Sequence, residues 1–311
     1  MSFTAKIKEE IVNEDLANSE IKNIVTAFIK YGNKSKNNIT LVLENPLIAR
    51  KVYNYIKLIF NTSAGITIRV QKRFKTKRIY ILSINNNINS ICKECNIEIS
   101  NGILKNGVYD LKTLVEKKSY LKGTFLSCGS VNDPSSGTYH FEMVLGNKKD
   151  SDFIMNILKE FGINAKVLKR TNKYMVYVKV SEEISDILKL FNANNALFYF
   201  EDIRTKKDHV NMINRLNNCE QANQDKTIQT GLKQIEDIKY LKDNDLITLL
   251  DEKTQLIISY REKYPELSYQ ELSEVVTLES GYKISKSGIN HHFIKIRELV
   301  NRHKKKSMAK E

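Results

Sequence analysis

The segment YLKGTFLSCGSV, Tyr120–Val131, decides the fold of this chain. Its apolar residues predict a helix that ends at Gly129, because glycine commonly follows the last turn of a helix. The segment IVTAFIKYG, Ile24–Gly32, has the same form, and its final glycine stands 97 residues earlier. The two segments predict an internal repeat of about 97 residues.

Other positions match at the same offset. The matched pairs include Ile66 and Ile163, Val70 and Val167, Lys72 and Lys169, Arg73 and Arg170, and Tyr80 and Tyr177. Each copy also predicts the same order of elements: an apolar helix, a short strand, a helix, a basic hairpin and another helix. These elements are Ile21–Tyr31, Ile39–Glu44, Pro46–Phe60, Ile66–Ile84 and Ile88–Cys95 in the first copy, and Ser119–Cys128, Tyr139–Leu145, Lys148–Phe161, Ile163–Val180 and Glu183–Phe191 in the second.

The repeat predicts an α+β fold in which two pseudo-symmetric αββαββα units pair into one domain. We expect this domain over residues 1–216, with repeats at about 1–97 and 98–195. The segment NALFYF, which follows Phe191, is expected to be its last strand.

Basic residues gather in the hairpin of each copy, without an acidic residue among them. Those we expect at a DNA-facing sheet are Arg69, Lys72, Arg73 and Lys75 in the first copy, and Lys169, Arg170 and Lys173 in the second. Either cluster alone is equally typical of an ordinary solvated surface. Because the arrangement occurs twice, we favour a basic sheet surface that contacts phosphates of duplex DNA.

The segment Tyr120–Val131 resembles the dodecapeptide motif of LAGLIDADG homing endonucleases. Leu121, Gly123, Phe125, Ser127 and Gly129 match its pattern, and the first copy keeps Ile24, Phe28 and Gly32. The resemblance implies that the two motif helices pack together, with an acidic metal ligand before each final glycine.

Here those two positions hold Tyr31 and Cys128, and neither supplies the carboxylate oxygen that Mg²⁺ requires. Asp133 lies four residues past Gly129 and is not expected to reach the same point. We therefore predict no catalytic residues, no metal, no cofactor and no enzymatic activity, since a fold does not carry its activity with it.

The last third of the chain predicts a linker and bridging helix over 217–248 and a helix-turn-helix domain with a basic tail over 249–311. The polar stretch Asn217–Asp225 is expected to be a hinge. Three helices are predicted in the final domain, at Glu252–Tyr264, Tyr269–Val276 and Lys286–Arg302. Ser268 and Ser285 are predicted N-caps, with Glu271 completing a capping box for the former. The turn predicted over Thr277–Ile284 is longer than usual for this motif.

The third helix resembles a helix-turn-helix recognition helix. Ile289, Phe293, Ile296 and Val300 form its predicted buried stripe. The residues we expect at DNA are Ser285, Lys286, Ser287, Asn290, His291, Lys295 and Arg297, because the first turn of such a helix enters the major groove. The alternative is an ordinary bundle helix. His291, His292 and His303 are not expected to bind metal.

Composition limits the classes of protein to consider. The 311 residues carry a formal net charge of +14, which favours an anionic partner. Four cysteines are too few for a disulfide scaffold, so we expect a reducing cytoplasm. Because duplex DNA is the expected partner, we also expect association with the nucleoid. No apolar run is long enough for a membrane helix, and the first residues do not have the form of a signal peptide.

The whole chain resembles the WhiA family of bacterial transcription factors. The resemblance lies in the opening Met1-Ser2-Phe3, in YLKGTFLSCGSVNDP, in NRLNNCEQANQDKT at 214–227 and in KISKSGINH at 283–291. It implies a DNA-binding regulator connected with cell division, chromosome segregation and, in spore-formers, sporulation. It leaves open a partner in the transcription machinery, such as a sigma-type protein, and the oligomeric state, a monomer included.

Our leading hypothesis is a sequence-specific transcription regulator that binds double-stranded DNA and does not cut it. Two alternatives remain open at this point. One is a divergent metal-dependent DNA endonuclease. The other is a non-specific architectural protein whose basic surfaces grip nucleic-acid phosphates.

Overall fold

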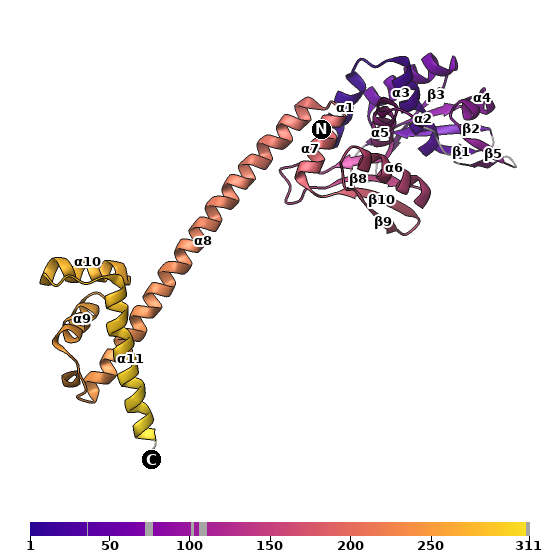
Figure 1. Ribbon diagram of the computed structural model, residues 1–311. Helices are drawn as coiled ribbons and strands as arrows, with labels where there is room; N and C mark the ends of the chain where they lie inside the picture. The colour runs from indigo at the N-terminus through magenta and orange to yellow at the C-terminus, as the bar shows by residue number, and fades with distance from the viewer. Residues whose placement is uncertain (36, 72–76, 101–102, 106–110, 309–311) are drawn as a thin grey trace. The chain divides into compact units, whose positions relative to one another are not determined.

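The computed structural model describes residues 1–35, 37–71, 77–100, 103–105 and 111–308. These residues form two compact units, Met1–Asp208 and His209–Glu311, each with its own apolar core. Helix α8 (Asn194–Asp243) contributes residues to both units (Figure 1). Among the helices of the described ranges, none combines the length and apolar character needed to span a membrane.

The N-terminal unit contains two copies of one four-stranded antiparallel sheet. The first copy consists of α1 (Phe3–Asn13), α2 (Asn18–Tyr31), β1 (Asn33–Ser35), β2 (Asn38–Leu43), α3 (Pro46–Phe60), β3 (Gly65–Gln71), β4 (Lys77–Ile84) and α4 (Ile88–Glu94). After the short pair β5 (Glu98–Ser100) and β6 (Ile103–Lys105), the second consists of α5 (Leu114–Cys128), β7 (Gly129–Val131), β8 (Phe141–Leu145), α6 (Lys148–Glu160), β9 (Lys166–Arg170), β10 (Lys173–Val178) and α7 (Ser181–Leu190).

The two sheets have the same topology. Their strand orders are β1-β2-β4-β3 and β7-β8-β10-β9, with every neighbouring pair antiparallel. The α+β fold with two repeated units is therefore confirmed.

Helices α2 and α5 pack against each other in the centre of this unit (Figure 1). Gly123 permits the contact, because a Cβ atom there would lie 2.6 Å from the backbone oxygen of Ile24. Beside it, Asn23 Nδ2 donates a hydrogen bond of 3.0 Å to Ser119 Oγ. The close approach predicted for the two motif helices is thus present.

The expected strand after Phe191 is instead the beginning of α8. Ala196 and Phe200, one helical turn apart, are both buried in the core. The Glu10 carboxylate accepts hydrogen bonds from the backbone N–H groups of Asn195 and Ala196, at 2.8 and 2.9 Å. These bonds satisfy the otherwise unpaired donors of the first helical turn, and so favour helix over strand.

The stretch 217–225, expected to be a hinge, is also helical. It is polar and exposed, but polarity alone does not break a helix. From Asn194 to Thr230 the chain contains neither proline nor glycine, the two residues that interrupt helices most strongly.

The C-terminal unit packs the end of α8 against α9 (Glu252–Lys263), α10 (Tyr269–Ser280) and α11 (Lys286–Met308). The capping box of Ser268 and Glu271 is present, and Ser285 Oγ accepts the Gly288 N–H at 3.2 Å. Helix α10 is longer than predicted, so the turn covers only residues 281–285. Gly281, with a φ of 69°, ends α10 in the left-handed conformation that glycine adopts most readily.

Candidate nucleic-acid interface

Helix α11 has one apolar face and one polar face. Its predicted apolar stripe is buried, with Ile289, Phe293, Ile296 and Val300 each at most 5% exposed. All seven residues expected at DNA are exposed, namely Ser285, Lys286, Ser287, Asn290, His291, Lys295 and Arg297. One half of the circumference of α11 is therefore exposed, and its side chains are polar or basic apart from Ile294, while the other half packs in the core.

Four of the seven line one groove. The groove has a volume of about 980 Å³ and lies between α10 and the beginning of α11. Its lining includes Ser285, Lys286, Ser287 and Asn290 together with side chains of α10. His291, Lys295 and Arg297 lie further along the same exposed half of α11.

The exposed basic residues differ in their surroundings. Arg297 Nε lies 3.8 Å from Asp237 Oδ2 on α8, so part of its charge is compensated. The carboxyl of Asp251 has a lowered pKa, chiefly because it accepts a hydrogen bond from Thr254 and less because Lys295 lies near. Lys286, at the first position of α11, lines the groove itself. It is therefore the best placed of these cations to meet a ligand in the groove.

Of the three histidines on α11, His292 and His303 take part in packing. Thr254 Oγ1 lies 2.7 Å from His292 Nδ1, and burial lowers the pKa of this imidazole. His303 Nδ1 lies 3.0 Å from the hydroxyl of Tyr240. Within the described ranges, no group of three or more His, Cys, Asp or Glu side chains could hold a metal ion.

The second basic hairpin divides its charges between two faces of the sheet. Lys173 pairs with Arg170, and Tyr177 with Lys166, so these basic residues share the face opposite the helices. Lys169 pairs with Tyr174, which in turn pairs with the buried Leu145, and therefore belongs to the helix side. Lys169, expected on the DNA-facing surface, thus lies on the other face.

In the first copy, Arg69 also lies on the face opposite the helices. Arg69 pairs with Ile79. The next residue, Tyr80, pairs with the buried Leu43 and so belongs to the helix side, which places Ile79 and Arg69 on the opposite face. Lys72, Arg73 and Lys75 lie outside the described residues.

The open faces also carry residues that the sequence analysis did not single out. Val42 is 50% exposed and Leu168 is 48% exposed, so apolar side chains interrupt the basic ones. On the second sheet Glu142 accepts a 3.0 Å hydrogen bond from Ser130 and lies 3.2 Å from His140 Nε2. Each open face is therefore mixed in chemistry, and alternation along the strands was the signal that could have shown it.

A cavity of about 390 Å³ lies at the C-terminal ends of α2 and α5. Tyr31 and Cys128 line this central cavity, at the two positions where the motif predicts metal-binding acids. Burial raises the pKa of Cys128 to about 12 and raises the pKa of Tyr31 well above its usual value. Both groups are therefore neutral near pH 7 and offer no anionic ligand.

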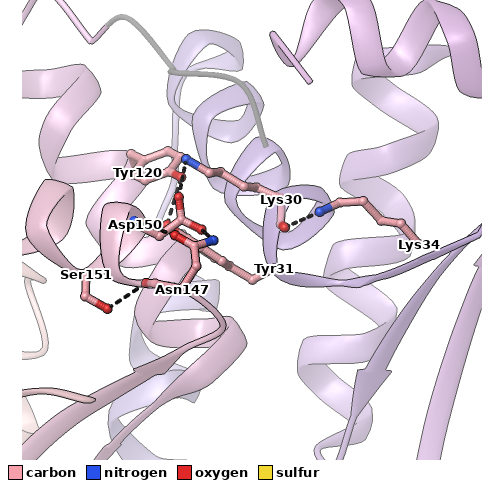
Figure 2. A network of polar contacts seen from close by, with 7 residues as sticks. All are labelled: Lys30, Tyr31, Lys34, Tyr120, Asn147, Asp150 and Ser151. Carbon is pink, nitrogen blue, oxygen red and sulfur yellow. Dashed lines mark hydrogen bonds and ion pairs between the residues drawn. The ribbon is translucent and has the colours of Figure 1, made fainter. Parts of the chain in front are cut away.

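Asp150 is a carboxylate of the central cavity that sequence reasoning missed. Its Oδ1 lies 3.0 Å from Lys30 Nζ, and Asn147 Nδ2 donates a hydrogen bond of 2.8 Å to Oδ2 (Figure 2). Tyr31 and Tyr120 join their hydroxyls at 3.0 Å beside this pair. The position of Asn147 as N-cap of α6, three residues before Asp150, was the available local signal.

The donors around the central cavity do not fit a divalent cation. Lys30, Lys34 and Lys173 line it, and among the described lining residues Asp150 is the one carboxylate. That carboxylate is already paired with an ammonium group, and Mg²⁺ prefers several oxygen ligands. Asp133 belongs to a turn, where it accepts hydrogen bonds from Ser135 and Tyr199.

Comparisons with known proteins cover nearly the whole chain. Three family models match: the WhiA N-terminal LAGLIDADG-like domain at 19–98, the WhiA LAGLIDADG-like domain at 117–210 and the WhiA C-terminal HTH domain at 213–300. The chain is 37% identical over 309 residues to the probable cell division protein WhiA of Bacillus subtilis, covering 96% of each. It is 35% identical over 315 residues to the protein of that name from Enterococcus faecalis, covering 99% of this chain and 100% of the relative.

Solved structures agree in fold. The crystal structure of full-length DUF199/WhiA from Thermatoga maritima matches with a TM-score of 0.58 and 24% identity, over 97% of this chain and 99% of that one. The structure of an N-terminal LAGLIDADG domain of DUF199/WhiA matches with a TM-score of 0.50 over 61% of this chain and 90% of that one.

Proposed function

Because this chain belongs to the WhiA family, we propose that it is a sequence-specific transcription regulator that binds double-stranded DNA and does not cut it. The observation that carries the proposal is the exposed polar half of α11, beside a groove that Lys286 and Asn290 line. A helix with an exposed polar half, packed at its beginning against a second helix such as α10, is suited to enter the major groove of DNA.

The side chains at the beginning of α11 suit two kinds of contact. Asn290 offers an amide that can pair with an adenine edge, and Lys286 can donate to guanine acceptors or to phosphate. Ser285 and Ser287 can donate to phosphate oxygens. Base edges provide specificity and phosphates provide most of the salt-dependent affinity, so a surface with both is expected to select a sequence.

The N-terminal unit then supplies a second surface. Arg69, Arg170 and Lys173 on the open faces are suited to phosphates, whereas Val42 and Leu168 on the same faces are suited to a protein. We propose a second DNA contact there, with a transcription-machinery or sigma-type protein as the other candidate partner. Two linked contacts on one DNA molecule would raise the overall affinity above that of either one.

Loss of nuclease activity is supported by the central cavity. Endonucleases with paired metal ions need oxygen ligands on both sides of the scissile phosphate. Here two neutral groups and a Lys30–Asp150 ion pair occupy that region. Such a centre can hold the two repeats together but provides no scaffold for a metal ion.

The names of the relatives suggest the cellular role. Those from Bacillus subtilis and Enterococcus faecalis are called probable cell division proteins. For this chain we propose action at the nucleoid in the cytoplasm, in the control of cell division and chromosome segregation, and of sporulation where the organism forms spores.

The proposal is tested with duplexes selected by the wild-type chain from a random pool. Replacing both Lys286 and Lys295 by glutamate should abolish binding to the selected duplex. Replacing Arg69, Arg170 and Lys173 by glutamine should weaken binding to all duplexes and lower the salt dependence. If the wild-type chain enriches no sequence and binds random duplex equally well, it is an architectural protein instead.

A further inference from the structure

A second cavity in the C-terminal unit lies at the other side of Lys286. It has a volume of about 370 Å³ and is bounded by α8, α9, the N-terminus of α10 and the beginning of α11. We call it the basic cavity, and its polar lining consists of Lys226, Thr227, Thr230, Arg261, Ser268 and Lys286. Lys226 and Thr227 end the NRLNNCEQANQDKT segment, for which the recognition surface of α11 gives no role.

The lining favours an anion. Three of its described residues are cationic and none is acidic. Ser268 caps α10: its Oγ accepts the Glu271 N–H at 3.3 Å, and the Glu271 carboxylate accepts the Ser268 N–H at 2.8 Å. The N-terminus of this twelve-residue helix adds partial positive charge.

Arg261 is a buried cationic residue in the lining of the basic cavity. The side chain is 1% exposed, and its Nη1 donates to the Leu267 carbonyl at 2.6 Å. Its buried Nε has no hydrogen-bond partner among the described residues. Burial of a charged guanidinium is unfavourable because it loses hydration, and an anion in the cavity would offset this desolvation.

The wall around Arg261 is also closely packed. A Cβ atom on Gly231 of α8 would lie 2.0 Å from the Pro265 carbonyl oxygen, so α8 touches the loop between α9 and α10 directly. The Arg261 guanidinium lies against the rings of Tyr269 and Phe293, at 6.0 and 5.5 Å from their centroids, and these two rings stack on each other. The guanidinium is therefore held in place before any ligand arrives, which reduces the ordering needed for binding.

We propose that the basic cavity binds a phosphate group, and that in the bound complex this is a backbone phosphate of the DNA read by α11. This inference rests on the proposed function. Lys286 connects the two surfaces, because it lines both the groove beside α10 and the basic cavity. A phosphate held here would fix the position of the first turn of α11 against the base edges. A free phosphorylated compound has the same chemistry and is the other source to be tested.

The first experiment compares two lysine variants of α8 in the full chain. Lys226→Gln removes a charge from the basic cavity, whereas Lys239→Gln removes an exposed charge from the same helix outside it. For the selected duplex, we expect Lys226→Gln to weaken binding about tenfold and to reduce the slope of log affinity against log salt by about 0.9. The preference for selected over scrambled duplex should remain, and Lys239→Gln should behave as wild type.

The second experiment tests the cavity without DNA. Inorganic phosphate, compared with chloride at equal ionic strength, should raise the melting temperature of the wild-type chain and not that of Lys226→Gln. Suppose that phosphate raises the melting temperature of the wild-type chain and not that of Lys226→Gln, while Lys226→Gln and Lys239→Gln bind DNA equally well. This result would assign the cavity to a free phosphorylated compound and overturn the DNA assignment. If Lys226→Gln binds DNA as well as Lys239→Gln does, and phosphate raises the melting temperature of Lys226→Gln as much as that of the wild-type chain, the phosphate site itself is overturned. If the wild-type chain selects no DNA sequence but the phosphate effect is present, the proposed function fails while the cavity stands.

Discussion

The ammonium of Lys30, on α2, lies 3.0 Å from the carboxylate of Asp150, on α6, and both side chains are almost fully buried. The pair joins the first repeat to the second beside the tyrosine hydroxyls of Figure 2. A buried charge that loses its partner is strongly unfavourable. The region that holds metal-binding acids in the motif's family therefore serves here as an ionic link between the repeats.

Replacing Lys30 by methionine should destabilise the N-terminal unit by about 3–5 kcal/mol, because the buried Asp150 carboxylate then loses the ammonium that lies 3.0 Å from it. Urea unfolding of the full chain, with hydrogen exchange in α2 and α5 as the local measurement, provides the test. The double variant Lys30→Met/Asp150→Leu should recover much of the loss. Lys206→Met, from an exposed ion pair, should change stability by less than about 1 kcal/mol. A double variant no more stable than Lys30→Met would refute the link.

Supercoiled plasmid incubated with the pure chain and Mg²⁺ or Mn²⁺ should remain uncut, since no described group of acidic side chains can hold the ion. Gel electrophoresis measures this directly. Cleavage that survives purification and disappears in Asp150→Asn or Asp133→Asn would revive the endonuclease alternative.

Gly123→Ala should destabilise the N-terminal unit by about 1–3 kcal/mol or more, through overpacking between α2 and α5. The added Cβ would meet the backbone of Ile24, at 2.6 Å from its oxygen, and backbone moves less easily than a side chain. Gly137→Ala is the control, because a Cβ there meets nothing within 4 Å. Thermal unfolding of both variants compares them, and equal melting temperatures would contradict the packing at Gly123.

The pH dependence of stability should carry a contribution from Lys8. Burial lowers its pKa to about 8 from 10.5, and its Nζ donates to the Leu126 carbonyl at 3.1 Å. Between pH 8 and pH 10.5 the Lys8 side chain is protonated in the unfolded chain and neutral in the folded chain. The free energy of unfolding therefore rises with pH in this interval, by at most about 1.4 kcal/mol per pH unit. Below pH 8 both states are protonated and this contribution no longer changes. Lys8→Met should lack the rise, and parallel curves for the two proteins would show that Lys8 keeps its ordinary pKa.

Local patterns predicted what depends on local periodicity. The repeat, the two glycine-ended helices and the buried stripe of α11 follow from apolar spacing, and the caps at Ser268 and Ser285 follow from the chemistry of helix ends. Aligning the chain with the motif was enough to show that Tyr31 and Cys128 stand where the motif has acidic metal ligands. Apart from the repeat, which comes from comparing the chain with itself, these features involve residues within a few turns of one another, where sequence spacing fixes geometry.

Features that depend on tertiary contact were missed. Lys30 and Asp150 are distant in sequence, and nothing near either residue indicates the other. The face of Lys169 depends on the two-residue turn at Thr171, whose φ is 46°, since a shift of one residue in register reverses every side chain. The first turn of α8 is helical because Glu10, from α1, accepts its N–H groups. For Lys30 and for the beginning of α8 a distant residue decides the outcome, and for Lys169 the register of the hairpin decides it.

The central claim is that the exposed half of α11 reads a DNA sequence. Selection of bound duplexes from a random pool, carried out with the wild-type chain and with Asn290→Ala, tests it most directly. The wild-type chain should enrich one motif, and Asn290→Ala should lose the preference at one base pair of that motif while the other positions remain. Enrichment of the same motif, unchanged at every position, by Asn290→Ala and by Lys286→Ala would contradict the claim.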